Sequence, residues 1–312
     1  MKNSHITCVG AGLIGQGWTT LFAANGYDVT LQDIDPEGLT AALTEIQSNL
    51  EFLERHQLLD SGTSVKALKK IATTLDLAVA VSGADYIQES VPDNPELKRQ
   101  VFAEIDAAAP REAIIASSAS GLLMSEIQTV TKYPSRCVLA HPFLPVHMIP
   151  LVEVVGGDLT SPETVTACVE LMTLIGKTPV RLKKEVPGYI VNRLQAALMR
   201  EAFDLVASGV ASAEDVDRAF CNGSGLRDPF VGPLLRAHLA GNGIERFISH
   251  YDQSYQKRWK SMATWTAVSE STADAVIKGV NDLQAVRSQS MEEMKARRDG
   301  QLVELLKMLD SR

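Results

Sequence analysis

Residues 5–35 read HITCVGAGLIGQGWTTLFAANGYDVTLQDID, and this stretch decides the fold of the first half of the chain. It begins with a short apolar run rich in β-branched residues, which predicts a buried strand. Three glycines follow, and apolar residues then recur at helical spacing as far as Asn25. A second strand-like run begins at Asp28 and leads to Asp33. The order strand, glycine turn, helix and strand is the beginning of a parallel βαβ unit.

The three glycines have the spacing of a dinucleotide-binding turn. Gly10, Gly12 and Gly15 form G-x-G-x-x-G directly after the first strand and at the start of the helix. The first glycine makes a tight turn, the second lets the backbone approach a pyrophosphate, and the third allows close packing of helix on strand. The phosphates then face the helix N-terminus. We expect Leu13 and Ile14, inside the motif, to belong to the same cofactor-binding turn.

An acidic residue follows the second strand. Asp33 lies 18 residues after Gly15, where a carboxylate can accept hydrogen bonds from the adenine ribose. Asp35 follows and no arginine is near, so this position would repel the 2′-phosphate of NADP. The sequence therefore predicts NAD as the cofactor. The alternative is a glycine-rich loop without a ligand, which the complete strand, loop, helix and acid pattern disfavours.

The pattern along the chain predicts an α/β fold: an N-terminal Rossmann-type doubly wound sheet and a C-terminal all-helical domain. Strands are expected near residues 5–9, 28–32, 85–89, 113–117, 137–140, 151–155 and 178–182. Helix starts are marked where a capping residue precedes a proline, at Asp35-Pro36 and Ser161-Pro162. After VRLKKEVPGYIVNRL only helical periodicity remains. We assign residues 1–184 to an NAD-binding Rossmann domain and residues 185–312 to a helical domain for substrate binding and dimerisation.

Composition narrows the class of function. The chain has 312 residues with a formal net charge of −8 and no basic run, which disfavours a nucleic-acid partner. The four cysteines are far apart without a C-x-x-C pair, so we expect free thiols in the cytoplasm and no bound metal. No apolar run reaches the roughly 20 residues of a membrane span, so no membrane partner is expected. A small-molecule substrate fits these features best.

Residues 140–155, AHPFLPVHMIPLVEVV, place ionisable groups in an apolar run. His141 directly follows an expected strand, and so lies at the carboxyl edge of the sheet, where ligands bind. Glu153 lies inside the next expected strand, and a buried carboxylate needs a partner. An imidazole proton is a suitable partner, because the acid then orients the ring and stabilises its charged form. We predict His141 as a general acid/base and Glu153 as the group that orients it.

Two further polar residues are expected at the same edge. Ser120, in IIASSASGL, follows another strand, and its hydroxyl can bind a substrate oxygen. Asn192, in PGYIVNRL, begins the helical domain and would face the crevice if the two domains close over it. Each candidate has an ordinary alternative. These are a solvated loop residue for His141, an ion-paired strand residue for Glu153, a turn cap for Ser120 and a polar helical residue for Asn192. Their convergence on one sheet edge favours the catalytic interpretation.

The stretches GAGLIGQGW, SSASG, HPFLPVHMIPLVEVVGG and EVPGYIVNRLQ together resemble the L-3-hydroxyacyl-CoA dehydrogenase superfamily. The resemblance covers essentially the whole chain and is greatest to the branch of lambda-crystallin/L-gulonate 3-dehydrogenase and L-carnitine dehydrogenase. It implies NAD-dependent oxidation of an L-3-hydroxy acid to the 3-oxo acid. It also implies a homodimer formed through the helical domain.

The resemblance gives roles to particular residues. It implies that His141 is the general acid/base and Glu153 its charge-orienting partner. Ser120 corresponds to the serine near the nicotinamide and the substrate oxygen, and Asn192 to the asparagine that the second domain supplies. The family usually reads H-P-x-N-P, whereas this chain has Leu144 at the asparagine position. That change removes a polar contact near the nicotinamide or substrate and leaves the base in place.

Two further matches concern the cofactor and the substrate. In SVPDNPELK, Asp93 and Lys98 correspond to an acidic residue and a lysine that help to hold NAD. In GSGLRDPFVGPLLRAHLAG, Arg227 corresponds to an arginine of the gulonate and carnitine enzymes. A guanidinium suits a free carboxylate, although an interdomain or surface ion pair is an equal alternative. The family tends to have an aromatic residue after this arginine, where this chain has Asp228, and that residue does not decide the substrate.

The charge of one region indicates whether the substrate carries coenzyme A. The region that would meet coenzyme A phosphates, LTAALTEIQSNLEFLERHQLLD, carries four acidic residues and one arginine. Phosphates require lysines and arginines, so acyl-CoA is disfavoured. We expect a small, L-gulonate-like L-3-hydroxy acid, with L-carnitine or a short-chain 3-hydroxyacyl-CoA as alternatives. A non-catalytic, crystallin-like NAD-binding protein is the alternative from another class, since a fold can outlast its chemistry.

Overall fold

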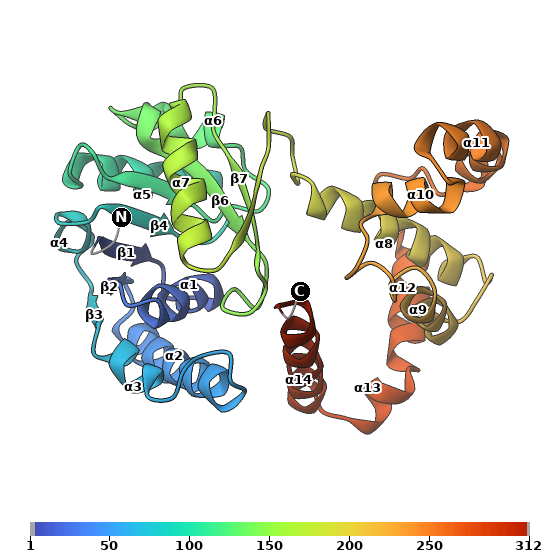
Figure 1. Cartoon of the computed structure of the whole chain (residues 1–312), viewed down its shortest axis with the longest axis horizontal. Helices are drawn as coiled ribbons and strands as arrows, with labels where there is room; N and C mark the ends of the chain where they lie inside the picture. Colours follow the sequence, from blue (N-terminus) through green and yellow to red (C-terminus); the bar gives the residue numbers. More distant parts are fainter. Residues whose placement is uncertain (1–3, 311–312) are drawn as a thin grey trace. The chain divides into compact units, whose positions relative to one another are not determined.

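The computed structural model describes residues 4–310, which divide into two compact units (Figure 1). The first unit holds the chain up to Val191 together with the residues from Val303 onward. The second unit is 192–302. The division therefore falls later than the boundary that we placed after residue 184. The reason is local: Glu185 accepts a hydrogen bond from the backbone N–H of Ser125 at 3.1 Å, and Tyr189 is buried within the first unit.

Within residues 4–310 the structure forms one sheet of eight strands, in the order β3-β2-β1-β4-β5-β6-β7-β8. All neighbouring strands run parallel except β6 and β7, which are antiparallel. This arrangement confirms the doubly wound sheet. The strands are β1 (His5–Val9), β2 (Asp28–Gln32), β3 (Ile71–Thr74), β4 (Tyr86–Glu89), β5 (Ile114–Ser117), β6 (Cys137–Pro142), β7 (Leu151–Val155) and β8 (Thr178–Arg181). The sequence analysis missed β3 because its four residues are partly or fully exposed and carry no buried apolar run.

Helices cover both faces of the sheet (Figure 1). One apolar core joins the sheet to α1, α2 and α7, and a second core on the opposite face joins it to α4, α5 and α6. The predicted helix starts are confirmed, since Asp35 accepts a hydrogen bond from the N–H of Glu37 and Ser161 from that of Thr164. The helices of this unit are α1 (Leu13–Ala24), α2 (Pro36–Arg55), α3 (Thr63–Leu68), α4 (Leu77–Val81), α5 (Pro95–Ala108), α6 (Met124–Ile127) and α7 (Pro162–Leu174), with 3₁₀ turns at Gln128–Val130 and Pro134–Arg136.

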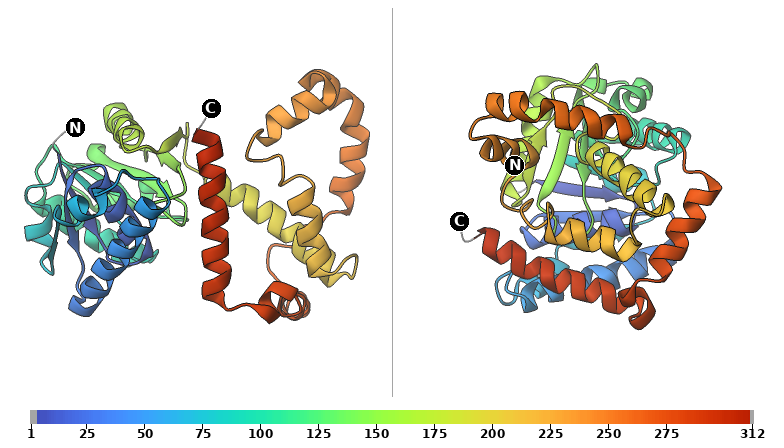
Figure 2. Two further views of the ribbon diagram at one scale, coloured as in Figure 1. Left: turned by 60° about the horizontal axis from the view of Figure 1, so that its bottom comes forward. Right: turned by 90° about the vertical axis from the view of Figure 1, so that its right-hand side faces the viewer.

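The second unit is entirely helical, as predicted, and no strand occurs in 192–302. Its helices α8, α11 and α12 contain no buried residue. Large apolar side chains are exposed instead, among them Leu226, Leu234 and Ile248. Figure 2 shows the last helix, in dark red, as one continuous element, although its final residues group with the first unit. The helices are α8 (Val191–Ala207), α9 (Ala213–Asn222), α10 (Pro233–Gly241), α11 (Ile244–Ser261), α12 (Glu270–Asn281), α13 (Gln284–Ser288) and α14 (Met291–Asp310).

The part of the chain that the structure describes contains neither a helix suited to span a membrane nor a metal-binding cluster. None of its helices combines the length and the apolar character needed to cross a membrane. Nor does that part hold a group of three or more His, Cys, Asp or Glu side chains arranged to bind a metal ion.

The close contact of α1 with the glycine turn gives a test of the fold. A Cβ added at Gly15 would lie 1.8 Å from the carbonyl oxygen of Gly10, so the helix must shift to admit it. We expect Gly15→Ala to lower the free energy of unfolding by roughly 2–4 kcal/mol, measured by urea denaturation. Gly12→Ala is the matched control, because a Cβ there meets no atom within 4 Å. Its cost should stay within about 1 kcal/mol. Equal stability of the Gly15→Ala variant and the wild type would contradict the close approach.

Candidate active site

The glycine turn has the geometry of a dinucleotide-binding loop. Gly10 has a φ of 96° and donates its N–H to the carbonyl of Gln32 at 2.8 Å. A side chain there would collide with the backbone of Ser90, whereas the space around Gly12 is open. Among the described residues, no side chain caps the amino end of α1. Backbone N–H groups at this helix end are therefore suited to the pyrophosphate of NAD.

Asp33 lies beside that turn as the sequence predicts. Its Oδ2 accepts the N–H of Ala11 at 2.6 Å, and its Oδ1 accepts the N–H of Asp35 at 3.1 Å. Both oxygens are thus oriented by the backbone, next to the glycine turn. Leu13 and Ile14 continue the turn into the first residues of α1, with Leu13 exposed. This arrangement fits the adenine ribose and the adjoining phosphates of a bound NAD.

His141 and Glu153 are in direct contact. They face each other across the antiparallel pair β6 and β7, and His141 Nδ1 lies 2.9 Å from Glu153 Oε2. Both side chains are buried. In the neutral ring, the carboxylate favours the tautomer that carries its proton on Nδ1, because only that nitrogen can then donate to it. The remaining nitrogen, Nε2, is left as a proton acceptor.

The second oxygen of Glu153 is also anchored. Oε1 accepts the backbone N–H groups of Ile190 at 2.8 Å and Val191 at 3.0 Å. Tyr189, just before them, has a φ of 49°, and this left-handed turn directs both N–H groups toward the carboxylate. Burial raises the pKa of Glu153, but the hydrogen bonds from His141, Val191 and Ile190 outweigh it and leave the pKa below its usual value. The acid is therefore held in its ionised form.

Tyr189 is a site residue that the sequence analysis missed. Its ring centroid lies 5.2 Å from that of His141, and its hydroxyl donates to the carbonyls of Leu122 at 2.6 Å and Ala119 at 3.2 Å. Phe143 contacts the same imidazole edge-on, with the centroids 4.7 Å apart. Two aromatic rings therefore fix the plane of the imidazole. The sequence does carry a signal for this turn, because Tyr189 directly follows Pro-Gly, where a left-handed turn is common.

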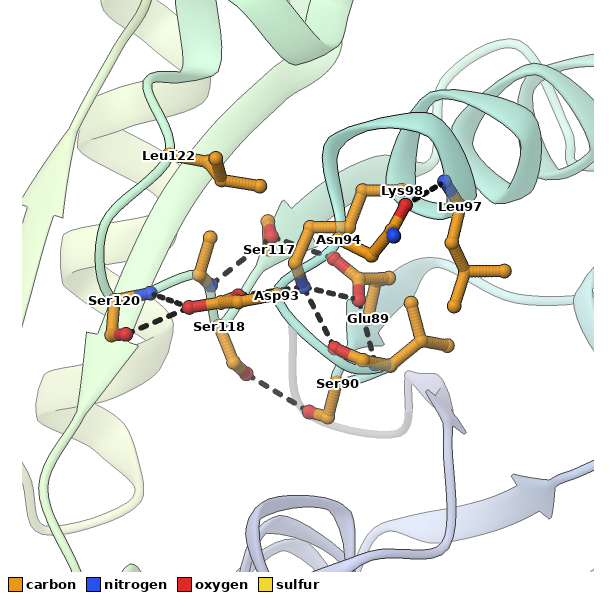
Figure 3. Close-up of polar contacts among 12 residues, drawn as sticks. Glu89, Ser90, Asp93, Asn94, Leu97, Lys98, Ser117, Ser118, Ser120 and Leu122 are labelled. Atoms are coloured by element: carbon orange, nitrogen blue, oxygen red, sulfur yellow. Dashed lines mark hydrogen bonds and ion pairs between the residues drawn. The ribbon is translucent and has the colours of Figure 1, made fainter.

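Ser120 on the loop after β5, Asp93 on the loop after β4 and Lys98 in α5 come together (Figure 3). Asp93 Oδ2 accepts both the N–H of Ser120 at 2.9 Å and its hydroxyl at 2.7 Å. Lys98 Nζ lies 3.3 Å from Asp93 Oδ1. Burial raises the pKa of Asp93, but the hydrogen bonds from Ser120 and the charge of Lys98 lower it below its usual value. Glu89, which the sequence analysis did not single out, lies fully buried behind them.

The remaining predicted residues lie elsewhere on the chain. Asn192 is the second residue of α8 and begins the second unit. Arg227 lies in the turn between α9 and α10, where its backbone N–H donates to Ser224 at 3.1 Å. Leu144 is exposed in the connection from β6 to β7. The roles of Asn192 and Arg227 stay predictions.

Both parts of the chain match domains of one enzyme family. The NAD binding domain of 3-hydroxyacyl-CoA dehydrogenase matches residues 5–186, and the C-terminal domain of the same enzyme family matches residues 188–280. The chain belongs to the 3-hydroxyacyl-CoA dehydrogenase family. This membership confirms the suspected superfamily and NAD as its cofactor, and it makes the chain an NAD-dependent dehydrogenase of the 3-hydroxy type.

Individual members of the family show which branch is similar. L-carnitine dehydrogenase of Streptomyces coelicolor is 38% identical over 305 residues, covering 97% of this chain and 94% of its own. Lambda-crystallin of Oryctolagus cuniculus is 38% identical over 272 residues, covering 87% and 85%. Among solved structures, 5-formyl-3-hydroxy-2-methylpyridine 4-carboxylic acid 5-dehydrogenase, an NAD⁺-dependent dismutase, has a TM-score of 0.85 at 29% identity, covering 99% of both chains. The branch named from the sequence is thereby confirmed.

From the contact of His141 with Glu153 we predict how Glu153→Gln changes turnover. In Glu153→Gln the amide NH₂ can turn toward Nδ1 of His141, which then forces the ring proton onto Nε2 and removes the acceptor. We expect kcat to fall roughly 1,000- to 10,000-fold, measured by NADH absorbance. Glu170→Gln, which alters an exposed carboxylate on α7, is the control and should retain normal turnover. Turnover of Glu153→Gln close to that of the wild type would contradict the orienting role.

The same pair sets a pH dependence of stability. The folded protein holds the pKa of Glu153 below its usual value of 4.5. Its stabilising contribution is therefore complete above pH 4.5 and is lost as the pH falls through the lower folded-state pKa. Urea denaturation should show that the wild type loses more stability than Glu153→Gln when the pH is lowered below 4.5. Parallel losses in the two proteins would contradict the assignment.

Proposed function

We propose that this protein oxidises the 3-hydroxyl of a small L-3-hydroxy acid to the 3-oxo acid, with His141 as the general base. The observation that carries the proposal is the 2.9 Å contact between His141 Nδ1 and Glu153 Oε2. It leaves Nε2 as the proton acceptor at the carboxyl edge of the sheet, which is the edge where NAD binds in this fold. NAD, when bound, supplies the hydride acceptor for the reaction.

The protein's own groups handle the proton. His141 Nε2 takes the proton of the substrate hydroxyl, and the imidazolium that forms is stabilised by the ionised carboxylate of Glu153. Two backbone N–H groups hold that carboxylate, so it does not need to reorganise as the charge develops. On the family resemblance, we place Ser120 and Asn192 beside the substrate oxygen and the nicotinamide. Their task is to position the substrate oxygen and the nicotinamide against the base.

The acidic surface of α2 supports a small acid over an acyl-CoA. Glu45 and Glu51 are exposed on this helix. Glu54 accepts the N–H of Gly62 at 2.7 Å and that of Ser64 at 2.9 Å, and these bonds lower its pKa. A fixed ionised carboxylate repels the phosphates of coenzyme A. Arg55, in the last turn, is the single basic residue of this helix, so α2 offers little of the cationic surface that such phosphates require.

Two small acids are the leading substrates. Arg227 is proposed to bind the substrate carboxylate, which L-gulonate and L-carnitine share. L-carnitine is favoured by the names of the relatives that are 38% identical to this chain. Against it, Asp228 is paired with Arg236 at 2.5 Å, so its charge is already compensated and is poorly placed to hold a trimethylammonium group. We keep an L-gulonate-like acid as the first candidate and L-carnitine as the second.

The assembly and the compartment belong to the same proposal. We propose that two copies pair through the helical unit, because α8, α11 and α12 bury no residue and expose large apolar side chains. Exposed apolar surface of this kind usually marks an interaction site. Cytoplasmic location is proposed on the four free cysteines, of which Cys8, Cys137 and Cys168 are buried thiols.

A substrate panel with one matched variant tests the function. The wild type and His141→Ala are assayed by NADH absorbance with L-gulonate, L-carnitine, L-3-hydroxybutyrate and L-3-hydroxybutyryl-CoA. We expect turnover of a free acid by the wild type, and a loss of at least roughly 1,000-fold in His141→Ala with unchanged NAD affinity by calorimetry. His147→Ala, which removes another histidine from the same connection, should retain turnover.

The outcomes separate the alternatives. Turnover of His141→Ala close to that of the wild type would remove the assignment of the base. A clear preference for the CoA ester would overturn the small-acid substrate. No rate with any of the four compounds would favour the non-catalytic, crystallin-like alternative.

A further inference from the structure

Glu89 is a fully buried carboxylate at the last residue of β4, and the proposed chemistry does not use it (Figure 3). Its Oε2 accepts the hydroxyl of Ser117 at 2.6 Å. Its Oε1 accepts the N–H of Val91 at 2.7 Å and an N–H of Lys98 Nζ at 2.8 Å. A carboxylate buried in this way destabilises the folded protein unless all of its hydrogen-bond and charge partners are in place. Its partners come from three segments: the end of β5, the loop after β4, and α5.

Lys98 transmits the position of Glu89 to the next carboxylate. The lysine is 1% exposed, and its ammonium group contacts Glu89, the carbonyl of Val91 at 2.9 Å and Asp93 at 3.3 Å. An ammonium group has three N–H donors, and these three acceptors use them. Lys98 therefore acts on the loop that carries Asp93, and its effect on NAD passes through that loop.

Asp93 in turn fixes Ser120. A single oxygen of Asp93 accepts both the N–H and the hydroxyl of Ser120. The hydroxyl hydrogen is directed to Asp93, so the serine oxygen acts as an acceptor toward a ligand. The chain of contacts then closes, because Ser117 lies three residues before Ser120 and donates to Glu89 at its other end. Glu89, Lys98 and Asp93 thus form a brace across the loop that presents Ser120.

We propose that Glu89 is a positioning residue for the nicotinamide end of NAD, acting through Lys98 and Asp93 on Ser120. The proposal rests on the proposed function in one respect, the place of Ser120 beside the nicotinamide. The charge of Glu89 is essential to it, because a neutral group at this position leaves the buried ammonium of Lys98 with Asp93 as its sole counter-charge among the described residues. Lys98 and Asp93 then rearrange, and the orientation of Ser120 is lost.

The simpler explanation is that Glu89 and Lys98 form an ion pair that only stabilises the fold. The chain offers a matched pair for comparison. Asp106 on α5 and Arg136 are also buried, with Oδ1 2.8 Å from Nη2, and Asp106 additionally accepts the N–H of Lys132. None of these three residues belongs to the candidate active site. Loss of the Asp106 charge therefore reports the purely structural cost of such a pair.

The test compares Glu89→Gln with Asp106→Asn in the full chain. Thermal unfolding measures stability, and calorimetry measures the Kd of NAD⁺ and NADH without any substrate. We expect both variants to lose stability, and Glu89→Gln alone to weaken NAD⁺ binding by about tenfold or more. Asp106→Asn should bind NAD⁺ within about twofold of the wild type. Unchanged NAD⁺ affinity in Glu89→Gln, or an equal loss in Asp106→Asn, overturns the proposal.

Two further variants keep the test decisive if Glu89→Gln does not fold. Ser117→Ala removes the hydrogen bond that the hydroxyl donates to the Glu89 carboxylate and the one that it accepts from the N–H of Ala119 at 3.2 Å. It should raise the Kd of NAD⁺ several-fold, and an unchanged Kd counts against the brace. Ser120→Ala should weaken NAD⁺ binding in the wild type but much less when combined with Ser117→Ala, since both act on the same contact. Strictly additive effects of these two substitutions would contradict the pathway.

The readouts separate this proposal from the proposed function. NAD⁺ affinity requires no turnover, so a failure to oxidise any 3-hydroxy acid leaves the role of Glu89 fully tested. Normal oxidation of a 3-hydroxy acid together with unchanged NAD⁺ binding in Glu89→Gln overturns the role of Glu89 and leaves the assigned base intact.

Discussion

The candidate active site depends on one contact, between the imidazole of His141 and the carboxylate of Glu153. Their meeting is a consequence of the one antiparallel pair in the described sheet, because β6 and β7 run in opposite directions and place the two residues in register. A parallel partner would need a long crossover, whereas here the short connection between the strands brings an acid and a base together within twelve residues. The same register buries both groups, so each needs the other.

Around this pair, the loop from Ser117 to Leu122 is held from two sides. Tyr189 packs against the imidazole and donates its hydroxyl to the loop carbonyls of Ala119 and Leu122. On the other side, Asp93 binds Ser120 and is itself held by the buried Lys98. The loop that carries Ser120 is thus tied both to His141 and to the loop after β4. Buried polar groups whose hydrogen bonds are all satisfied make a loop rigid. A rigid loop suits a site that must align a hydroxyl with a nicotinamide.

Local sequence patterns were enough to predict the glycine turn, seven of the strands and the two capped helix starts, because each depends on neighbouring residues. The His141 and Glu153 contact was also within reach, since a buried acid twelve residues away needs a partner. Glu89 was not, because its partner Lys98 comes from another element and nothing in the run YIQE marks the acid as buried. The turn at Tyr189 has a local signal, an aromatic residue directly after Pro-Gly, but its contact with the His141 ring joins residues far apart in the sequence, and so Tyr189 was missed. The return of the chain from Val303 to the first unit is a non-local contact that no periodicity encodes.

The most direct test of the account is the proton on His141, read by long-range ¹H–¹⁵N NMR of the ¹⁵N-labelled protein. The signals of His141 are identified among those of the six histidines because they are missing from the spectrum of His141→Gln. At a pH where the His141 ring is neutral, the account predicts a protonated Nδ1 and an unprotonated Nε2, and the reverse in Glu153→Gln. A wild-type ring with its proton on Nε2 would contradict the claim that Glu153 prepares His141 to accept the proton of a substrate hydroxyl.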